Sequence, residues 1–122
     1  MVDLSILLAD DDPNIRQLVS INLRKRNFDV REVSDGQQAI DALGEALPDV
    51  IVLDMDMPNK TGYEVCVWAR AHGIETPILI MTAYSPIDMK ILTLQAGAND
   101  YLVKPFRIED FLNRLRALAE AH

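Results

Sequence analysis

The sequence predicts a single α/β domain with a doubly wound parallel sheet, and two observations lead to that prediction. Five short apolar runs alternate with five longer segments that carry apolar residues at helical spacing, and a parallel sheet needs such a crossover helix between successive strands. The chain has 122 residues, of which 49% are hydrophobic, which is enough for one core and one domain. We therefore expect five strands with helices on both faces of the sheet.

The five apolar runs are the expected strands. In chain order they are LSILLA (4–9), FDVREV (28–33), DVIVLD (49–54), PILIM (77–81) and DYLV (100–103). The first, third and fourth runs are apolar almost throughout, as is typical of strands that are covered on both faces, whereas FDVREV alternates between apolar and polar residues. We therefore expect residues 28–33 near an edge of the sheet.

Two of the expected helices have recognisable start signals. Asp12 followed by Pro13 is a favourable N-cap and first helical residue, and Ser34 and Gln37 have the spacing of a capping box. The apolar residues that these helices should bury are Ile15, Leu18 and Val19 in the first, and Ala39, Ile40, Leu43 and Leu47 in the second.

Three further helices are expected from apolar spacing. They cover residues 62–72, residues 87–96 and a segment that begins at Ile108. The apolar positions that define the last two helices are Ile87, Ile91 and Leu94 in one, and Phe111, Leu112 and Leu115 in the other.

Composition argues against several classes of function. The formal net charge of -7 repels nucleic acid and anionic membranes at long range, so we expect no direct nucleic acid binding and no membrane association. No apolar run approaches the length that spans a bilayer, and the start of the chain lacks the basic flank and cleavage site of a secretion signal. Cys66, the single cysteine, cannot form an internal disulfide. We expect a cytoplasmic location.

Residues that carry chemistry follow four of the five expected strands. In a doubly wound sheet, ligands bind beyond the carboxyl ends of the strands. The residues found there are Asp10, Asp11 and Asp12 after the first strand, Asp54 and Asp56 after the third, Thr82 after the fourth, and Lys104 and Pro105 after the fifth. We expect a site where these four ends meet.

The carboxylates of this group need an explanation, because neighbouring carboxylates raise one another's pKa. A solvated charge run, the ordinary explanation, suits Asp12, an expected N-cap, but not Asp54, which directly follows the apolar residues IVL. Convergent carboxylates suit a hard cation, and an incomplete set suits Mg²⁺ better than Ca²⁺. Lys104 and Thr82 suit phosphate oxygens. We therefore expect Mg²⁺ and an anion to bind together.

Four motifs carry a family resemblance. They are Asp10–Asp11, the turn DMDMPNKTG (54–62), which fits D-x-x-M-P-x-x-x-G, then Thr82–Ala83, and Lys104–Pro105–Phe106, spaced 43, 28 and 22 residues apart (11 to 54, 54 to 82, 82 to 104). Together they resemble the receiver domain of bacterial two-component response regulators over essentially the whole chain. The resemblance implies a flavodoxin-like (βα)5 fold with strand order 2-1-3-4-5, in which residues 1–122 form one receiver domain with no output domain.

The resemblance also implies a role for each site residue. Asp54 resembles the phosphoacceptor, Asp11 the direct Mg²⁺ ligand, and Asp10 its partner acting largely through water. The backbone carbonyl of Asp56 resembles a further Mg²⁺ ligand, and Thr82 resembles the switch hydroxyl. Lys104 resembles the phosphate-binding lysine, which is commonly followed by a cis peptide bond. Tyr101 resembles the aromatic residue that reports phosphorylation.

The implied function is that of a signalling switch, not an enzyme, apart from catalysis of its own phosphotransfer and autodephosphorylation. A histidine kinase or histidine phosphotransfer protein would donate the phosphoryl group to Asp54, with Mg²⁺ as the cofactor. Phosphorylation would change the face formed by the fourth helix, the fifth strand and the fifth helix. That face would control a downstream effector or a fused output domain, and a phosphorylation-dependent dimer is a further option.

Three other interpretations compete with this one. A haloacid-dehalogenase phosphatase also uses a strand-ending D-x-D, with Asp56 as general acid, but Pro58 stands where threonine or valine is usual and no cap domain is present. A flavodoxin needs a hydroxyl- and glycine-rich loop after the first strand, where this chain has aspartates. A docking module that works without phosphorylation needs none of the site residues, all of which are retained here.

Two residues are expected to set the lifetime of the phosphoryl group. In the family, the residues two beyond the acceptor and two beyond the switch threonine flank the path of the hydrolytic water, and here they are Asp56 and Tyr84. The Asp56 carboxylate could orient a water or repel hydroxide, so the sign of its effect is open. The Tyr84 ring should exclude water and slow hydrolysis, unless it merely packs on the loop surface.

Overall fold

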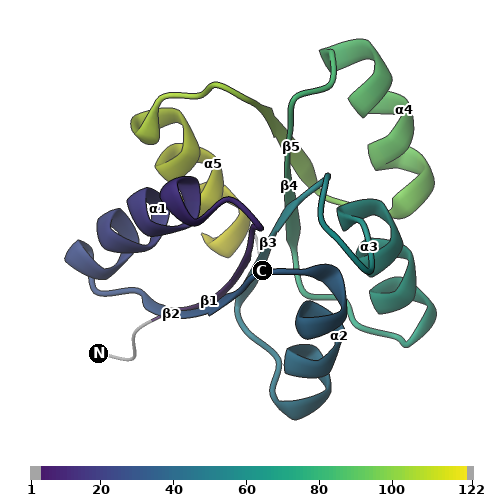
Figure 1. Cartoon of the computed structure of the whole chain (residues 1–122), viewed down its shortest axis with the longest axis horizontal. Helices are drawn as coiled ribbons and strands as arrows, with labels where there is room; N and C mark the ends of the chain where they lie inside the picture. Colours follow the sequence, from purple (N-terminus) through teal and green to yellow (C-terminus); the bar gives the residue numbers. More distant parts are fainter. Residues whose placement is uncertain (1–3, 121–122) are drawn as a thin grey trace.

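The computed structural model describes residues 4–120, apart from the side chain of Met89, as five strands that alternate with five helices (Figure 1). The strands are β1 (Ser5–Ala9), β2 (Asp29–Val33), β3 (Val50–Asp54), β4 (Ile78–Thr82) and β5 (Asp100–Val103). The helices are α1 (Pro13–Lys25), α2 (Gly36–Glu45), α3 (Gly62–Ala71), α4 (Pro86–Ala96) and α5 (Ile108–Glu120). Every element expected from the sequence is present. In the described part of the chain, no helix has both the length and the apolar character to cross a bilayer.

All five strands are parallel, and their order in the sheet is β2-β1-β3-β4-β5. The predicted order is therefore confirmed, and so is the place of β2 at an edge. From β1 the chain adds β2 on one side and then β3, β4 and β5 on the other. Such a reversal opens a crevice beyond the carboxyl ends of β1 and β3, which is where ligands bind in sheets of this kind.

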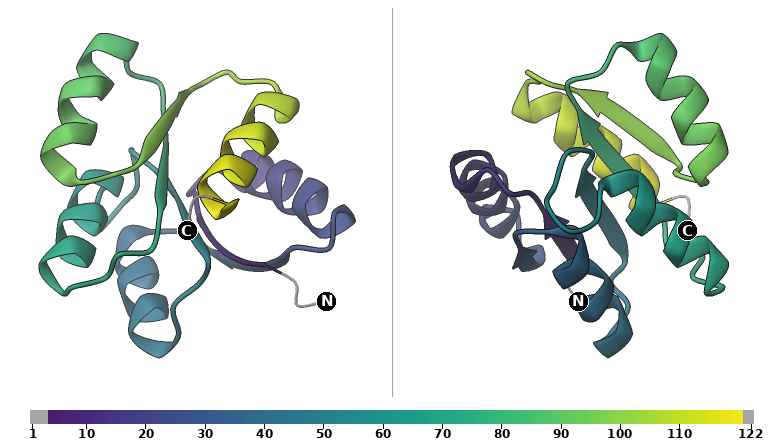
Figure 2. Two further views of the ribbon diagram at one scale, coloured as in Figure 1. Left: turned by 180° about the vertical axis from the view of Figure 1, so that it is seen from behind. Right: turned by 45° about the vertical axis from the view of Figure 1, so that its right-hand side comes forward.

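Two layers of helices cover the sheet, with α1 and α5 on one face and α2, α3 and α4 on the other (Figures 1 and 2). Alternate residues of a strand point to opposite faces. In β1, Ile6 and Leu8 therefore belong to the core beneath α1 and α5, whereas Leu7 and Ala9 belong to the core beneath α2, α3 and α4. The two cores hold the carboxyl ends of the central strands in fixed positions.

The first two helices begin close to their predicted starts. Asp12 is the N-cap of α1, and its side chain accepts hydrogen bonds from the backbone of Asn14 and Ile15, with Pro13 as the first helical residue. The N-cap of α2 lies one residue later than the predicted capping box placed it. Asp35, not Ser34, is the N-cap and accepts from the backbone of Gln38, because an aspartate caps as well as a serine and Gln38 has the same spacing from Asp35.

Two apolar residues predicted to be buried are exposed, in contrast to their neighbours Val19 and Leu43. Leu18 is 57% exposed because the face of α1 that meets the sheet passes through Val19 and Leu23. Leu47 is 56% exposed because α2 ends at Glu45, two residues before it. In both cases apolar spacing extended the buried stripe too far.

The apolar positions that indicated α4 in the sequence lie on the exposed side of that helix. Ile87, Ile91 and Leu94 are 76%, 53% and 77% exposed. The inner face of α4 is formed instead by smaller or partly buried residues, among them Leu92 and Ala96. Because α4 packs mainly against α3 and β5, few of its positions meet the core, and apolar spacing alone could not distinguish the buried face from the exposed one. In α5, by contrast, Phe111, Leu112 and Leu115 are buried as predicted.

Candidate functional site

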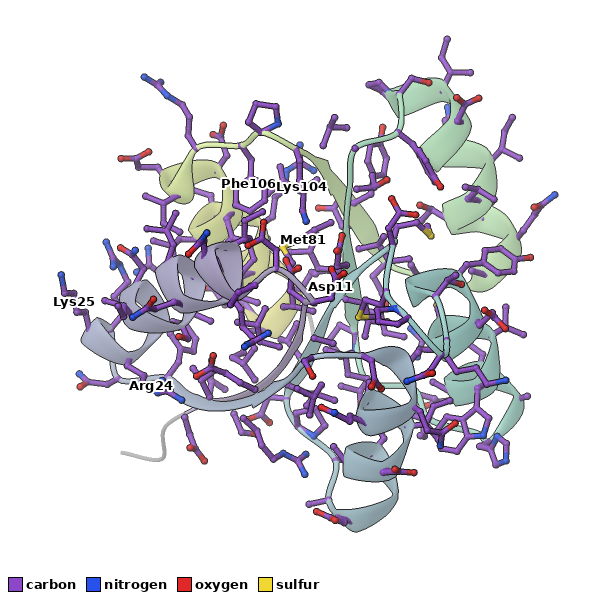
Figure 3. The ribbon with its side chains drawn as sticks, in the orientation of Figure 1. Asp11, Arg24, Lys25, Met81, Lys104 and Phe106 are labelled. Carbon is purple, nitrogen blue, oxygen red and sulfur yellow. The ribbon has the colours of Figure 1, made fainter. Side chains whose placement is uncertain are left out.

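The carboxyl ends of β1, β3, β4 and β5 meet at one edge of the sheet, as the sequence predicted. The buried polar side chains at this edge are Asp10, Asp54 and Thr82, and the amine of Lys104 reaches the same place from the residue after β5. Figure 3 shows Asp11, Met81 and Lys104 around this end of the sheet. Strands far apart in sequence therefore bring the predicted residues together.

Three carboxylates form a compact cluster at this edge. Asp10, Asp11 and Asp54 each offer one oxygen, and these oxygens lie within 4.8 Å of one another. Asp10 is fully buried and Asp54 is 5% exposed, whereas Asp11 faces solvent. An all-oxygen donor set of this size, open on one side to water, fits Mg²⁺, which keeps several waters when it binds to proteins. Asp10, Asp11 and Asp54 are the residues that would hold the ion.

The Asp56 carboxylate points elsewhere. It is exposed and accepts a hydrogen bond from the hydroxyl of Tyr84, with 3.0 Å between the oxygens. The role predicted for its backbone carbonyl as a Mg²⁺ ligand stays a prediction, and so does the water-mediated role of Asp10.

Lys104 supplies the positive charge of the site. Its Nζ lies 3.0 Å from Oδ1 of Asp54 and 3.4 Å from Oδ2 of Asp10. The backbone N–H of Lys104 donates to the carbonyl of Thr82, and the peptide bond between Lys104 and Pro105 is cis, as the family resemblance led us to expect. One ammonium group thus partly compensates two buried carboxylates.

The charges at this site shift the pKa values of their neighbours. Burial, reinforced by the charge of Asp10, raises the pKa of Asp54 from 3.8 to about 7, although Lys104 acts in the opposite direction. Burial alone would lower the pKa of Lys104, but its contacts with Asp54 and Asp10 outweigh burial, so the pKa of the lysine is raised. The site brings three carboxylates together with one lysine, and this excess of negative charge favours binding of a cation.

The backbone around Asp54 is closely packed. The N–H of Met55 donates to the carbonyl of Met81 and the N–H of Gly62 donates to the carbonyl of Met55, at 2.8 and 2.9 Å. A Cβ added to Gly62 would lie 2.5 Å from the carbonyl oxygen of Asp54, so a side chain there would collide with backbone. The glycine of the turn motif is thus explained by the close approach of α3 to the residue that ends β3.

Asp10 is held by contacts that the sequence did not predict. Its N–H donates to the carbonyl of Val33 at the end of β2, its Oδ1 accepts from the N–H of Asp12, and its carbonyl accepts from Nη1 of Arg16 at 2.7 Å. The edge strand, which contributes no residue to the acidic cluster, therefore supports it. The only signal for Arg16 in the sequence is its place on the second turn of the helix after the acidic run.

Thr82 and Tyr101 lie on different parts of the molecule. Thr82 is fully buried beside the acidic cluster, and its Oγ1 accepts a hydrogen bond from the N–H of Tyr84 at 3.0 Å. Tyr101 is half-buried on β5 against the core beneath α2, α3 and α4. The structure thus places Thr82 within the site and Tyr101 outside it, and the role of Tyr101 in switching stays a prediction.

Comparison with known proteins identifies the family. The family model described as "Response regulator receiver domain" matches residues 6–116. The response regulator MprA of Mycolicibacterium vanbaalenii is 41% identical over 113 residues, which cover 93% of this chain and 49% of MprA. The receiver domain of the Francisella response regulator 1452 has a TM-score of 0.93 at 32% identity and 98% coverage of both chains.

A third similar protein is longer than this chain. The response regulator DrrB of Thermotoga maritima, an OmpR/PhoB homologue, has a TM-score of 0.89 at 31% identity, and the match covers 98% of this chain but 54% of DrrB. The chain also spans about half the length of the curated relatives that it matches.

These relatives correct one prediction. The exclusion of nucleic acid as a partner was drawn from the net charge of -7 on this chain. MprA and the OmpR/PhoB homologue DrrB both extend well beyond the region that this chain matches. Charge on one segment says nothing of a region outside it, so the exclusion is withdrawn.

Proposed function

The chain belongs to the family of response regulator receiver domains, and we propose that Asp54 is the residue on which it accepts a phosphoryl group. One observation carries this proposal. The carboxylate of Asp54 ends a buried strand, lies within 4.8 Å of those of Asp10 and Asp11, and contacts Nζ of Lys104 at 3.0 Å. A nucleophile, a set of cation ligands and a phosphate-binding ammonium group are therefore in one place.

The chemistry follows from these positions. An oxygen of Asp54 attacks phosphorus, a new O–P bond forms, and the bond from phosphorus to the donor breaks in line. When bound, Mg²⁺ supplies neutralisation of the phosphoryl oxygens. Because the pKa of Asp54 is raised to about 7, part of the population carries a proton near neutral pH, and only the ionised carboxylate is nucleophilic. Lys104 favours that ionised form and afterwards pairs with a phosphoryl oxygen.

The donor in this proposal is a phosphohistidine of a histidine kinase or a phosphotransfer protein. A receiver domain is a signalling switch, and catalysis is limited to its own phosphotransfer and autodephosphorylation. Membership of the family supports both the donor class and a cytoplasmic location. The effector is either a separate protein or an output region of the same polypeptide, and relatives about twice as long support the second arrangement.

The switch in this proposal starts at Thr82. Its hydroxyl would donate to the phosphoryl group and draw the loop between β4 and α4 toward Asp54, which would give Tyr101 room to turn inward. The exposed apolar residues Ile87, Ile91 and Leu94 on α4 support a partner surface on this side of the molecule. An effector or a second phosphorylated copy would bind the face formed by α4, β5 and α5.

Incubation with acetyl phosphate and Mg²⁺ tests the proposal. We expect one phosphoryl group per chain in the intact mass spectrum and no sustained release of phosphate from phosphomonoesters. Multiple turnover on phosphomonoesters would instead indicate a phosphatase, and the absence of any label would indicate a docking module that works without phosphorylation. Omission of Mg²⁺ is the control, since it should prevent labelling.

A further inference from the structure

Arg16 joins the acidic loop to the edge strand of the sheet. Its Nη1 donates to the backbone carbonyl of Asp10 at 2.7 Å, and its Nε lies 3.5 Å from Oε1 of Glu32 on β2. The side chain of Arg16 is 23% exposed and that of Glu32 is 28% exposed. One guanidinium group thus contacts both the loop after β1 and the strand β2, and a guanidinium is suited to this because its donors lie in a rigid plane.

Glu32 is itself held by a second arginine. Nη1 of Arg24 lies 3.0 Å from Oε2 of Glu32, and Nη2 of Arg24 donates to the carbonyl of Val30. The result is a chain of contacts that runs from Asp10 through Arg16 and Glu32 to Arg24. Glu32 therefore both fixes the guanidinium of Arg16 and compensates its charge.

The contacts of Arg16 affect Asp11, the member of the acidic cluster that faces solvent. Asp11 lies between Asp10, which is anchored through its N–H, its carbonyl and its carboxylate, and Asp12, which caps α1. The carbonyl of Asp10 belongs to the peptide unit that joins Asp10 to Asp11. A hydrogen bond to that carbonyl fixes the plane of the peptide and so restricts where the Asp11 side chain begins.

We propose that Arg16 is a positioning residue for the Mg²⁺ site. It holds the peptide between Asp10 and Asp11 so that the exposed Asp11 carboxylate stays within reach of Asp10 and Asp54 before the ion arrives. This inference rests on the proposed function, since it concerns the same cation site. Groups that orient metal ligands from outside the coordination sphere commonly contribute about tenfold or more to metal affinity.

The direction in which the Mg²⁺ affinity changes when Arg16 is replaced distinguishes a positioning role from a purely electrostatic one. A positive charge near a cation site weakens cation binding, so loss of the Arg16 charge alone would make Mg²⁺ bind more tightly. Loss of a positioning contact would make it bind more weakly. The two mechanisms predict opposite changes in the dissociation constant.

A matched pair of variants tests the proposal in the folded protein. Arg16→Met and Arg24→Met remove the same group and the same charge from one network, but only Arg16 contacts Asp10, and Arg24 lies farther along α1, away from Asp11 (Figure 3). The readout is the Mg²⁺ dissociation constant without phosphodonor, from backbone amide shifts. We expect Arg16→Met to raise it about tenfold and Arg24→Met to change it less than about twofold.

Several controls keep the result interpretable. Urea unfolding in EDTA shows whether each variant is folded, and Arg16→Lys serves as a second variant that retains the charge and the stem. We expect Arg16→Lys also to weaken Mg²⁺ binding, because one ammonium group cannot contact both Asp10 and Glu32 as the guanidinium does. Equal or tighter binding in Arg16→Met, or wild-type affinity in Arg16→Lys, would overturn the positioning role.

Failure of the proposed function would look different. If the wild-type protein itself neither binds Mg²⁺ nor accepts phosphate from acetyl phosphate, the site assignment fails, and the role of Arg16, which rests on it, fails with it. If the wild-type protein is phosphorylated and loses Mg²⁺ binding in Asp11→Asn but not in Arg16→Met, the site assignment stands and the role of Arg16 is excluded.

Discussion

The hydroxyl of Tyr84 donates a hydrogen bond to the carboxylate of Asp56, with 3.0 Å between the two oxygens. This bond joins the loop after β4 to the loop after β3, two residues beyond the buried Asp54. The hydrogen bond and charge of Asp56 raise the pKa of the Tyr84 phenol. The N–H of Tyr84 also donates to Oγ1 of Thr82, so Tyr84 connects the proposed switch residue to the loop that follows Asp54.

We predict that Tyr84→Ala speeds the loss of phosphate by about tenfold, which corresponds to about 1.4 kcal/mol of barrier. The ring, which is 41% exposed, would no longer hinder the approach of water in line with the O–P bond. The measurement is the dephosphorylation rate of purified phosphoprotein in Mg²⁺ after the donor is removed.

Tyr84→Phe is the matched control for this prediction, because it keeps the ring and removes the bond to Asp56. If the ring excludes water, the Phe variant should stay within about threefold of wild type. An unchanged or slower rate in Tyr84→Ala would contradict shielding by the ring and leave Asp56 as the main determinant of lifetime.

Asp54→Asn should stabilise the metal-free protein. A pKa of about 7 for the buried carboxylate means that its charge is unfavourable in the folded state, and each pKa unit corresponds to about 1.4 kcal/mol. Because the variant also loses the contact with Lys104, we expect a net gain of about 1 to 3 kcal/mol in unfolding free energy at pH 8. Urea unfolding in EDTA measures it, and a clear loss of stability would show that the pair with Lys104 outweighs the repulsion.

The same carboxylate predicts how stability depends on pH. Between the ordinary pKa of 3.8 and the folded value of about 7, Asp54 holds a proton in the folded protein that it has lost in the unfolded chain. The contribution of Asp54 to the free energy of unfolding is therefore fully present below pH 3.8 and is lost as pH rises through about 7. The free energy of unfolding falls by at most about 1.4 kcal/mol per pH unit in this range.

Unfolding of the wild type and of Asp54→Asn from pH 5 to pH 8 in EDTA isolates this contribution. The stability of the wild type should fall relative to that of the variant as pH rises, and saturating Mg²⁺ should reduce the difference, because the cation favours the ionised carboxylate. Parallel curves for the two proteins would show that the pKa of Asp54 is not raised.

Binding of a phosphoryl analogue should perturb a region much larger than the acidic cluster. If Thr82 moves toward the analogue, its bond to Tyr84 changes and the loop before α4 follows, so we expect amide shift changes across residues 82–106. In the Thr82→Ala variant, the amide shift changes should be confined to the neighbours of Asp54. Shifts that remain restricted to the neighbours of Asp54 in the wild-type protein would mean that this chain does not switch through Thr82 and Tyr101.

The sequence predicted the fold well because its strands differ clearly in pattern. The fully apolar runs became the buried strands β1, β3 and β4, and the alternating run became the edge strand β2. Where the prediction was wrong, as for Leu18 and Leu47, apolar residues that were expected to be buried are exposed. Apolar spacing identifies a helix face but not which side meets the protein.

The sequence predicted part of the site, namely the residues that follow the strands. Residues that end strands can be read from the sequence, so Asp10, Asp54, Thr82 and Lys104 were predicted to lie together, and the structure brings them together. Contacts that depend on the rotamer of a long side chain could not be predicted. The bond from Arg16 to the carbonyl of Asp10 is one of these, and the bond between Tyr84 and Asp56 is another.

Identification of the phosphorylated residue tests the central claim most directly. Wild-type protein, Asp54→Asn and Asp11→Asn are incubated with acetyl phosphate and Mg²⁺, trapped by borohydride reduction, and digested for peptide mass spectrometry. We predict that the wild-type protein is modified at Asp54 alone and that neither variant is modified, although both remain folded. Phosphate incorporation that persists in Asp54→Asn, or a modified residue other than Asp54 in the wild-type protein, would contradict the assignment.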